Sequence, residues 1–255
     1  MSVYCGDYTA LCVTKFGDKI YVDTRDTSLA PHLMVQGEWE PWVSNQFRQS
    51  LAARPGAHVI DVGANFGWYT LLACRLGASH VTAFEPNPRL AALLRRTVSV
   101  NGLRQKVTVC QYAASDSAGR RRLVFDTYEL GGGSLPQVTS PMLKSTEEVV
   151  LVETQRLDDG IVPGFALEPR PGLVIKIDVE GHELDVLRGA EKILKLRPVL
   201  FVEHHRDNAR GLVELLGKEF TIRHVQHTGH AGAELSLEAL LDVLDAETLL
   251  CEPRS

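Results

Sequence analysis

The sequence predicts an α/β fold in which a mostly parallel sheet carries helices on both faces. Three observations predict it. From residue 55 onward, short apolar runs alternate with segments of helical periodicity, which is the pattern of repeated βα units. The run PVLFVEHH at 198–205 is apolar on both faces, as a central parallel strand is. The stretch VIDVGANFGWYT at 59–70 passes from a buried strand into a helix through a glycine-bracketed turn, a junction typical of ligand-binding α/β sheets.

The predicted elements of this sheet follow one another along residues 55–255, which we expect to form the main domain. Five runs are expected to be parallel strands: HVIDVG, SHVTAFEP, KVTVCQYAAS, GLVIKIDVEG and PVLFVEHH. Helical periodicity predicts helices at 67–77, 88–102 and 182–197. The runs FTIRHVQ and TLLCEP are expected to complete a seven-stranded sheet as a terminal pair.

Two further segments extend this plan. Residues 1–54 are expected to form a cap: a β-hairpin turning at Gly17 and Asp18, and then a helix at 37–54 that ends before Pro55 and Gly56. The runs RRRLVF and EEVVLVETQRL predict an antiparallel hairpin inserted into the main domain. The polar, glycine-rich segment between them, around 126–150, is expected to be a lid, because long structureless loops in compact domains are usually functional.

The composition narrows the class of protein. A net charge of −5 and a pI near 6.0 argue against nucleic acid as the partner, since nucleic-acid binders usually carry a basic surplus. The five cysteines include no CxxC pair, which favours free thiols over disulfides or a cysteine zinc site. No signal peptide and no membrane-spanning run is recognisable. We therefore expect a cytoplasmic protein that acts on a small molecule.

The glycine turn at 61–67 predicts which ligand the sheet binds. In an open α/β sheet the ligand lies beyond the carboxyl ends of the strands, so Asp61, Gly63, Asn65 and Gly67 are expected to line its site. A pyrophosphate-binding turn would read GxGxxG, and a carboxylate at Asp61 would repel phosphate. The same carboxylate would attract an ammonium or sulfonium group. S-adenosylmethionine carries both cations and no phosphate, and it is the predicted cofactor.

Two later strand ends are expected to complete this cofactor site. Glu85, at the end of the second strand, is the expected acceptor for the two ribose hydroxyls. Proteins that bind nicotinamide cofactors carry an acid at the same place, so Glu85 alone does not distinguish a nicotinamide cofactor from S-adenosylmethionine. The third strand ends in AASD, which by position places Ala114, Ser115 and Asp116 beside the adenine.

The segments VIDVGANFGWYT, AFEPNP, AASD, IKIDVEGHELDVLRGAEKIL and RPVLFVEHH together resemble the FkbM family of S-adenosylmethionine-dependent methyltransferases. The resemblance runs from about Gly37 to TLLCEP and includes GEWE and GGGSL. It implies the Rossmann-like class I methyltransferase fold and acceptor hydroxyls on sugars or polyketide-type products. It also implies that Glu40 approaches the cofactor. The predicted cofactor-binding residues are Glu40, Asp61, Gly63, Ala64, Asn65, Gly67, Trp68, Tyr69, Thr70, Glu85, Pro86, Asn87, Ala114, Ser115 and Asp178.

The reacting end of the site is expected where the fourth and fifth strands end, in KIDVEGHE and FVEHH. The predicted catalytic residues are Asp178, His182, Glu203 and His204. Two mechanisms stay open. In one, His182 or His204 is a general base oriented by a neighbouring carboxylate. In the other, Asp178, Glu203 and His204 hold Mg²⁺ or Mn²⁺.

Neighbouring charged residues have structural interpretations. Glu183 is expected to cap a helix, as acids in a first helical turn often do. Lys176, inside an apolar strand, is expected to neutralise Asp178 or another acid.

The sequence thus predicts an O-methyltransferase acting on a hydroxyl of a small glycoside, a saccharide or a secondary metabolite. N-methylation of a small molecule is the first alternative. A nicotinamide-dependent oxidoreductase is the second, and the sequence of the glycine turn argues against it. The sequence leaves open whether the protein is a homodimer.

Overall fold

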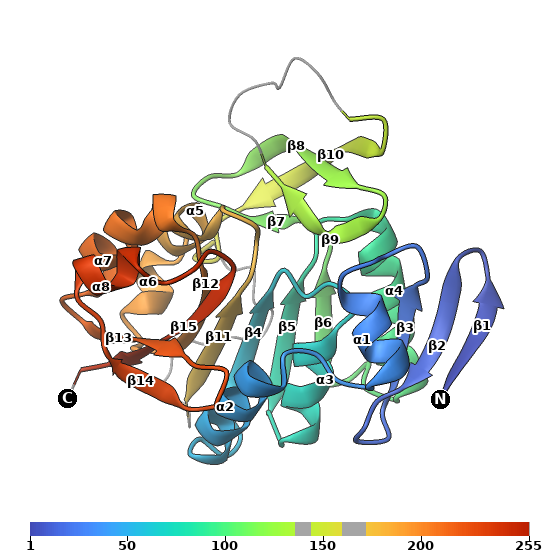
Figure 1. Cartoon of the computed structure of the whole chain (residues 1–255), viewed down its shortest axis with the longest axis horizontal. Helices are drawn as coiled ribbons and strands as arrows, with labels where there is room; N and C mark the ends of the chain where they lie inside the picture. Colours follow the sequence, from blue (N-terminus) through green and yellow to red (C-terminus); the bar gives the residue numbers. More distant parts are fainter. Residues whose placement is uncertain (136–143, 160–171, 255) are drawn as a thin grey trace.

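An eight-stranded sheet forms the centre of the computed structural model, which describes residues 1–135, 144–159 and 172–254 (Figure 1). The strand order is β14-β13-β15-β12-β11-β4-β5-β6. The strands are β4 (His58–Val62), β5 (His80–Phe84), β6 (Val107–Cys110), β11 (Leu173–Ile177), β12 (Val199–His204), β13 (Phe220–Val225), β14 (Ala231–Glu234) and β15 (Glu247–Pro253). Strands β6, β5, β4, β11 and β12 pair in parallel, and β15 is antiparallel to both β12 and β13. The predicted α/β fold is therefore confirmed. The eighth strand, β14, is a four-residue edge strand without apolar alternation, which is why the sequence pattern did not predict it.

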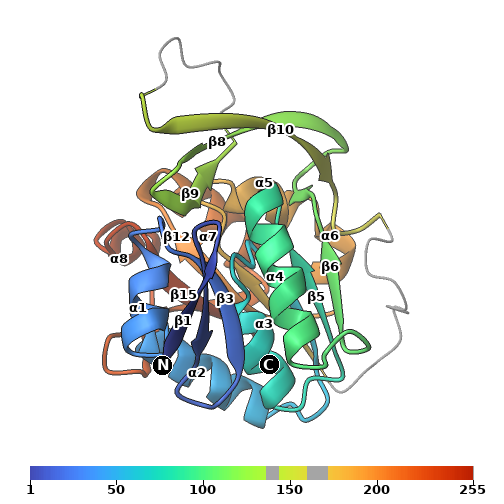
Figure 2. The same cartoon turned by 90° about the vertical axis from the view of Figure 1, so that its right-hand side faces the viewer.

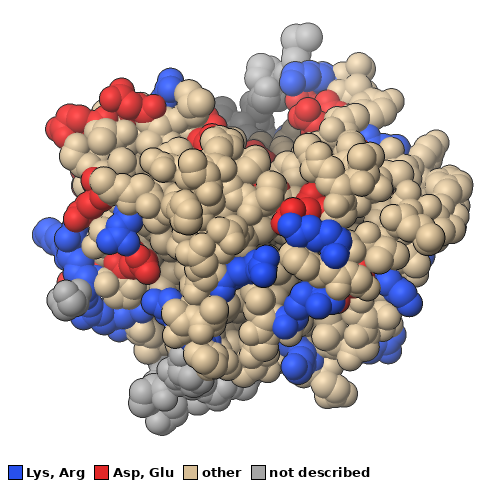
Figure 3. Space-filling view, turned by 60° about the horizontal axis from the view of Figure 1, so that its bottom comes forward, with Lys and Arg blue, Asp and Glu red and all other residues tan. Residues whose placement is uncertain are grey.

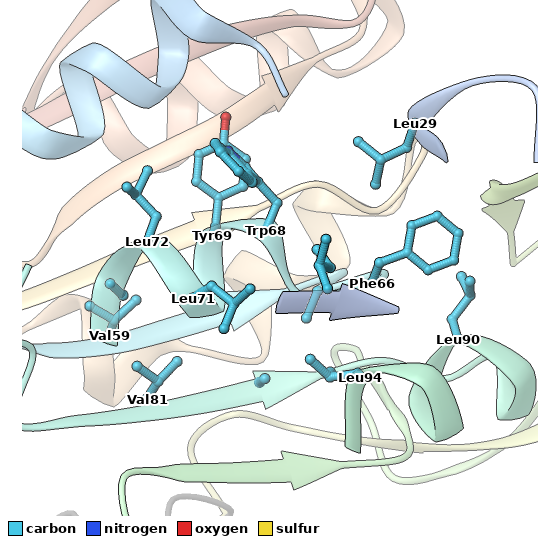
Figure 4. Packing of buried hydrophobic residues seen from close by; sticks show 14 of the residues in the cluster. Leu29, Val59, Phe66, Trp68, Tyr69, Leu71, Leu72, Val81, Leu90 and Leu94 are labelled. Carbon is cyan, nitrogen blue, oxygen red and sulfur yellow. The ribbon is translucent and has the colours of Figure 1, made fainter. Parts of the chain in front are cut away.

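Helices cover both faces of this sheet because successive strand residues point to opposite sides. Val59 packs with α2 (Pro41–Ala52), α3 (Trp68–Arg75) and α4 (Pro88–Val100), as Figure 4 shows for part of that side. Its neighbour Ile60 packs on the other side with α5 (Glu183–Arg188), α6 (Glu191–Leu194), α7 (Ala209–Leu216) and α8 (Leu237–Leu241). A short 3₁₀ turn at Arg206–Asn208 leads into α7.

The single helix predicted at 182–197 is divided into α5 and α6. A Cβ at Gly189 would lie 2.0 Å from the Ser115 carbonyl oxygen, so the chain passes this point only with glycine. The Asp158 carboxylate then accepts hydrogen bonds from the backbone N–H groups of Lys192 and Ile193 and caps α6. The break depends on two segments far away in the sequence, so helical periodicity did not reveal it.

The N-terminal segment is a three-stranded antiparallel sheet, β1 (Ser2–Gly6), β2 (Thr9–Val13) and β3 (Lys19–Asp23). The predicted hairpin corresponds to β2 and β3, and β1 is an additional edge strand. Strand β3 lies beside α4 (Figure 2). A short helix that the sequence did not predict, α1 (Leu29–Val35), precedes the predicted helix, which forms as α2.

The insertion is a second sheet that lies above the main one in Figure 1. Its strand order is β7-β10-β8-β9, with β7 (Ala113–Ala114), β8 (Gly119–Asp126), β9 (Glu129–Ser134) and β10 (Glu147–Gln155). The predicted antiparallel hairpin forms as β8 and β10. The glycine-rich start of the predicted lid is strand β9, and residues 136–143 of that prediction lie outside the described residues.

Two chemical features of the chain agree with its composition. All five cysteines are free thiols. On the face shown in Figure 3, Lys and Arg are interspersed with Asp, Glu and uncharged residues. Within the described ranges, no helix combines the length and apolarity needed to cross a bilayer.

Candidate active site

The turn between β4 and α3 needs glycine because other segments approach its backbone closely. Gly63 has φ +81°, and a Cβ there would lie 1.8 Å from the Asp178 carbonyl oxygen. Gly67 has φ +98°, and its Cβ would lie 2.5 Å from a methyl carbon of Leu94 on α4. Asn65 between them adopts φ +50°, a conformation that Asn tolerates better than most residues. The turn is thereby held directly over the carboxyl ends of β4 and β11.

Glu85 connects this turn to the next strand. One carboxylate oxygen accepts the Asn65 N–H at 2.8 Å and the other accepts the Asn87 N–H at 2.9 Å. Burial, together with the nearby charge of Asp61, raises the pKa of Glu85 to about 7. Each carboxylate oxygen has further lone pairs, which suits the predicted role of accepting two hydroxyl groups.

A pocket of about 540 Å³ opens beside Glu85. Its walls are Val62, Gly63, Asn65, Phe84, Glu85, Pro86, Asn87, Tyr112, Ala113, Ala114, Leu123, Leu130, Gly131, Gly133, Leu135, Asp178, Val179 and His182. We call this the first pocket. The buried Asn87 Nδ2 and Asn65 Oδ1 form no hydrogen bond with any residue that the structure describes, so both atoms are free for a ligand.

Strand β9 of the insertion forms one wall of the first pocket. Leu130, Gly131 and Gly133 line it, and a Cβ at Gly131 would lie 2.3 Å from Asn65 Nδ2. The insertion therefore lies directly against the glycine turn. The described part of the predicted lid covers this pocket.

Several predicted cofactor residues lie behind the pocket wall. Asp61 is buried, and its carboxylate accepts a hydrogen bond from the Thr70 hydroxyl at 2.6 Å. Burial raises its pKa to about 6. Asp61, Thr70 and Gly67 are not among the wall residues of either pocket described here. Asp61 therefore does not contact the space in either pocket, and it can attract a bound cation only through the glycine turn that lies between them. Ser115 is also buried and bonds to His182.

A second pocket, of about 1550 Å³, adjoins the first and shares Gly63, Asn65, Gly131 and Asp178 with it. The N-terminal segment contributes Ser28, Leu29, His32, Gln36, Trp39, Glu40, Pro41 and Trp42. The main domain contributes Ala64, Trp68, Tyr69, Glu180, Glu203 and Ala246. The two pockets therefore lie side by side and share a wall made of these four residues.

Glu40 enters the second pocket from the start of α2. Its backbone has φ +40°, a strained conformation for a residue with a side chain. Its carboxylate accepts a hydrogen bond from the Tyr69 hydroxyl at 2.8 Å. Burial raises the pKa of Glu40. The predicted residues Glu40, Ala64, Trp68 and Tyr69 are thus brought together here.

Asp178 lies where the two pockets meet and pairs with a buried lysine. Lys176 Nζ lies 2.7 Å from an Asp178 carboxylate oxygen, which confirms the predicted ion pair. Burial alone would lower the pKa of Lys176, but the charges of Asp178 and Glu40 raise it overall. Lys176 also lies 5.2 Å from the centre of the Tyr69 ring.

A second cluster lies at the end of β12. The donor atoms of Glu180, Glu203 and His205 lie within 4.8 Å of one another, and Glu203 Oε2 is 3.1 Å from His205 Nε2. Burial and then the charge of Asp178 raise the pKa of Glu203 to about 8. The hydrogen bond to Glu203 raises the pKa of His205 to about 9.

The structure does not bring His204, which was predicted as a base or as a metal ligand with Asp178 and Glu203, to this cluster. Side chains alternate along a strand, so Glu203 and His205 share one face of β12 while His204 points to the other. His204 is fully buried there, beside the backbone of Leu240 and Val243 at α8. The alternation was the signal that could have identified His205.

His182 lies apart from the carboxylates at the end of β12. It lines only the first pocket, with Nε2 3.0 Å from the Ser115 hydroxyl and Nδ1 3.1 Å from an Asp185 carboxylate oxygen. Burial lowers its pKa. Both ring nitrogens are thus engaged, which does not favour His182 as the base. Glu183 accepts hydrogen bonds from the Val179 and Gly181 N–H groups, in keeping with its expected structural role.

Comparison with known proteins gives the same assignment as the motifs. Residues 61–228 match the Methyltransferase FkbM domain. The 31-O-demethyl-FK506 methyltransferase FkbM of Streptomyces tacrolimicus is 35% identical over 221 residues, which are 74% of this chain and 82% of that protein. The hexuronic acid methyltransferase AglP of Haloferax volcanii is 32% identical over 145 residues, 57% of this chain and 54% of its own length. The crystal structure of an FkbM methyltransferase from Methylobacillus flagellatus KT is 17% identical, with a TM-score of 0.49 over 77% of this chain and 43% of that one. The chain belongs to the FkbM family of S-adenosylmethionine-dependent methyltransferases.

Proposed function

We propose that this enzyme transfers the methyl group to a hydroxyl of a small glycoside, a saccharide or a secondary metabolite. One observation carries the proposal: Asp178, Glu180 and Glu203 line a large pocket that adjoins the first pocket, and Asp178 lines both. Relatives named for acting on 31-O-demethyl-FK506 and on a hexuronic acid support a hydroxylated acceptor.

The cofactor is proposed to occupy the first pocket and to reach Asp178. Glu85 would accept the ribose hydroxyls, Asn87 Nδ2 would donate to the nucleoside, and Ala114 would contact the adenine. Their positions on one pocket wall support this assignment. Glu40 and Asp178 are the carboxylates that we assign to the ammonium and sulfonium end, because the second pocket begins at their side chains.

Glu203 is the residue that we propose as general base. S-adenosylmethionine supplies an electrophilic methyl group when it is bound. Glu203 would take the proton of the acceptor hydroxyl as the methyl group passes from the sulfonium sulfur to the acceptor oxygen, which would leave S-adenosylhomocysteine. His205 would hold the Glu203 carboxylate through the hydrogen bond at 3.1 Å. A carboxylate with a pKa of about 8 suits proton transfer near neutral pH.

A metal-assisted version remains a second candidate because of one observation. Glu180, Glu203 and His205 offer two carboxylates and an imidazole within 4.8 Å, a donor set that fits Mg²⁺ or Mn²⁺. A bound ion would polarise the acceptor hydroxyl. We propose this set in place of Asp178, Glu203 and His204, because His204 points to the other face of β12.

Calorimetry and rate measurements on chelator-treated protein test the proposal. S-adenosylhomocysteine is expected to bind, NAD⁺ is not, and Glu203→Gln should retain the affinity of the wild type. With labelled cofactor and a panel of hydroxylated acceptors, Glu203→Gln should lower kcat at least about 100-fold, the usual contribution of a general base. Full activity in this variant would exclude Glu203 as the base. Activity that disappears with chelator and returns with Mn²⁺ would favour the metal version, and failure to bind S-adenosylhomocysteine would overturn the cofactor site.

A further inference from the structure

The second pocket has an unusual balance of charge. Four carboxylates line it, Glu40, Asp178, Glu180 and Glu203, and none of its described wall residues is Lys or Arg. Two cations lie behind the wall, Lys176 paired to Asp178 at 2.7 Å and His205 paired to Glu203 at 3.1 Å. Carboxyl groups therefore outnumber the cations that accompany them by four to two.

Bound cofactor would bring little further positive charge to this pocket. S-adenosylmethionine has a sulfonium, an ammonium and one carboxylate, so it adds a single net positive charge. With Glu40 and Asp178 assigned to the cofactor, Glu180 and Glu203 are the carboxyl groups of the second pocket that are left to face the acceptor.

The backbone holds this pair of carboxylates in place. Glu180 has φ +53°, a conformation that costs about 1–3 kcal/mol for a residue with a side chain and persists only where the surroundings impose it. Glu203 ends a buried strand and is itself largely buried. A carboxylate oxygen of each lies within 4.8 Å of the other, so a positive group between them would relieve their repulsion.

The same pocket is lined by aromatic rings. Trp39, Trp42, Trp68 and Tyr69 contribute to its wall. The hydroxyl of Tyr69 and the indole N–H of Trp68 are engaged by Glu40 and Ser44, which holds both rings in position. Aromatic faces attract cations, and the attraction increases when water is excluded. Aromatic rings combined with carboxylates, and without Lys or Arg in the wall, are the chemistry of a site for positively charged nitrogen.

We infer that the second pocket selects an acceptor that carries a basic nitrogen close to the methylated hydroxyl, as an amino sugar does, and discriminates against acceptors with a carboxylate. The inference rests on the proposed function and narrows its substrate class. It also separates this enzyme from AglP, which is named for a hexuronic acid. A carboxylated ring would add a negative charge beside Glu180 and Glu203.

Three matched glycosides test this inference. Calorimetry on metal-free protein saturated with S-adenosylhomocysteine compares methyl glucosaminide, methyl glucoside and methyl glucuronide, which differ chiefly in charge. The amino glycoside is expected to bind at least about tenfold more tightly than the neutral one, and the uronide least tightly. Glu180→Gln should reduce the preference for the amino glycoside to about threefold or less. The matched control, Glu191→Gln on the exposed side of α6, should leave it unchanged.

The possible outcomes are separable. If S-adenosylhomocysteine fails to bind, the proposed function fails. If it binds and the uronide binds as tightly as the amino glycoside, or the amino glycoside does not bind, only the charge-selective pocket is overturned. Retention of the full preference in Glu180→Gln would likewise show that Glu180 does not set it.

Discussion

Burial determines what individual carboxylates of this site can do. Glu85 and Glu203 both have raised pKa values, about 7 and about 8, but their surroundings differ. Both oxygens of Glu85 accept backbone N–H groups, so this residue supports the glycine turn as well as the pocket. Glu203 has one side-chain partner, His205, and faces the pocket where the acceptor is proposed to bind. The surroundings of Glu85 favour ligand binding, and those of Glu203 favour proton transfer.

The pH dependence of the rate should report Glu203. A carboxylate accepts a proton only when it is ionised, so kcat/KM is expected to rise between pH 6 and 9 with an apparent pKa near 8. His205→Asn removes a hydrogen bond that lowers the pKa of Glu203, so the profile should move to higher pH. Initial rates at saturating cofactor, measured across this pH range, give the profiles of the wild type and of His205→Asn. A flat profile, or a move to lower pH in His205→Asn, would remove Glu203 from this role.

At the scale of elements, the glycine turn and strand β9 depend on each other. The turn lies over the ends of β4 and β11 because Gly63 lets the Asp178 carbonyl approach. Gly131 on β9 then lies against the Asn65 side chain and lines the first pocket. The inserted sheet is thus part of the wall of this pocket and not only an extension of the fold.

Two neighbouring glycines allow this contact to be tested. Gly131→Ala places a methyl group 2.3 Å from Asn65 Nδ2, so the Asn65 side chain in the pocket wall or β9 must shift, and affinity for S-adenosylhomocysteine should fall about tenfold, or about 1.4 kcal/mol. Gly132→Ala meets nothing closer than 3.5 Å and should change the affinity less than twofold. Calorimetric titration of the two variants makes the comparison. Equal affinities would mean that β9 does not shape the pocket.

At the scale of the whole molecule, a buried ion pair attaches the N-terminal sheet to the main domain. Arg89 on α4 donates from Nε to the fully buried Asp23 carboxylate of β3 at 2.8 Å and from Nη2 to the Thr9 hydroxyl at 2.8 Å. The N-terminal segment also supplies Trp39 and Glu40 to the second pocket. Loss of this attachment would therefore affect both stability and the acceptor site.

Asp23→Asn tests the attachment. The variant should be destabilised by about 3 kcal/mol in urea unfolding, because it leaves buried hydrogen bonds and charge uncompensated. Asp18→Asn, which breaks a more exposed pair with Arg75, should lose less than about 1 kcal/mol. Burial alone would raise the pKa of Asp23, but hydrogen bonds from Arg25 and Arg89 lower it overall. The contribution of Asp23 to the free energy of unfolding is thus fully present above its ordinary pKa of about 3.8. It is lost as the pH falls through the lower pKa that Asp23 has in the folded protein. Equal stability of the two variants would exclude the attachment.

The residues that could be predicted lie in short, continuous motifs. VIDVGANFG, FEPN and KIDVEG each place their functional residues within a few positions of a strand end, so the location of Gly63, Glu85 and Asp178 follows from recognising the strand. His205 was left out of the predicted catalytic residues in favour of the adjacent His204, although one position of difference along β12 moves a side chain to the other face of the sheet. The depth of Asp61 was missed because it depends on Thr70 and on the neighbouring strand β11.

The sequence by itself determined the α/β sheet, the ligand end of that sheet and the family, because alternating hydrophobicity and local turn chemistry act between residues close in the chain. Only the tertiary structure decided which carboxylates share a pocket, which histidine joins them and that β9 covers the glycine turn. Those contacts join residues from separate segments, and their distances depend on how whole elements pack. Charge selection in the second pocket arises from that packing, because Glu40, Glu180 and Glu203 come from three different elements.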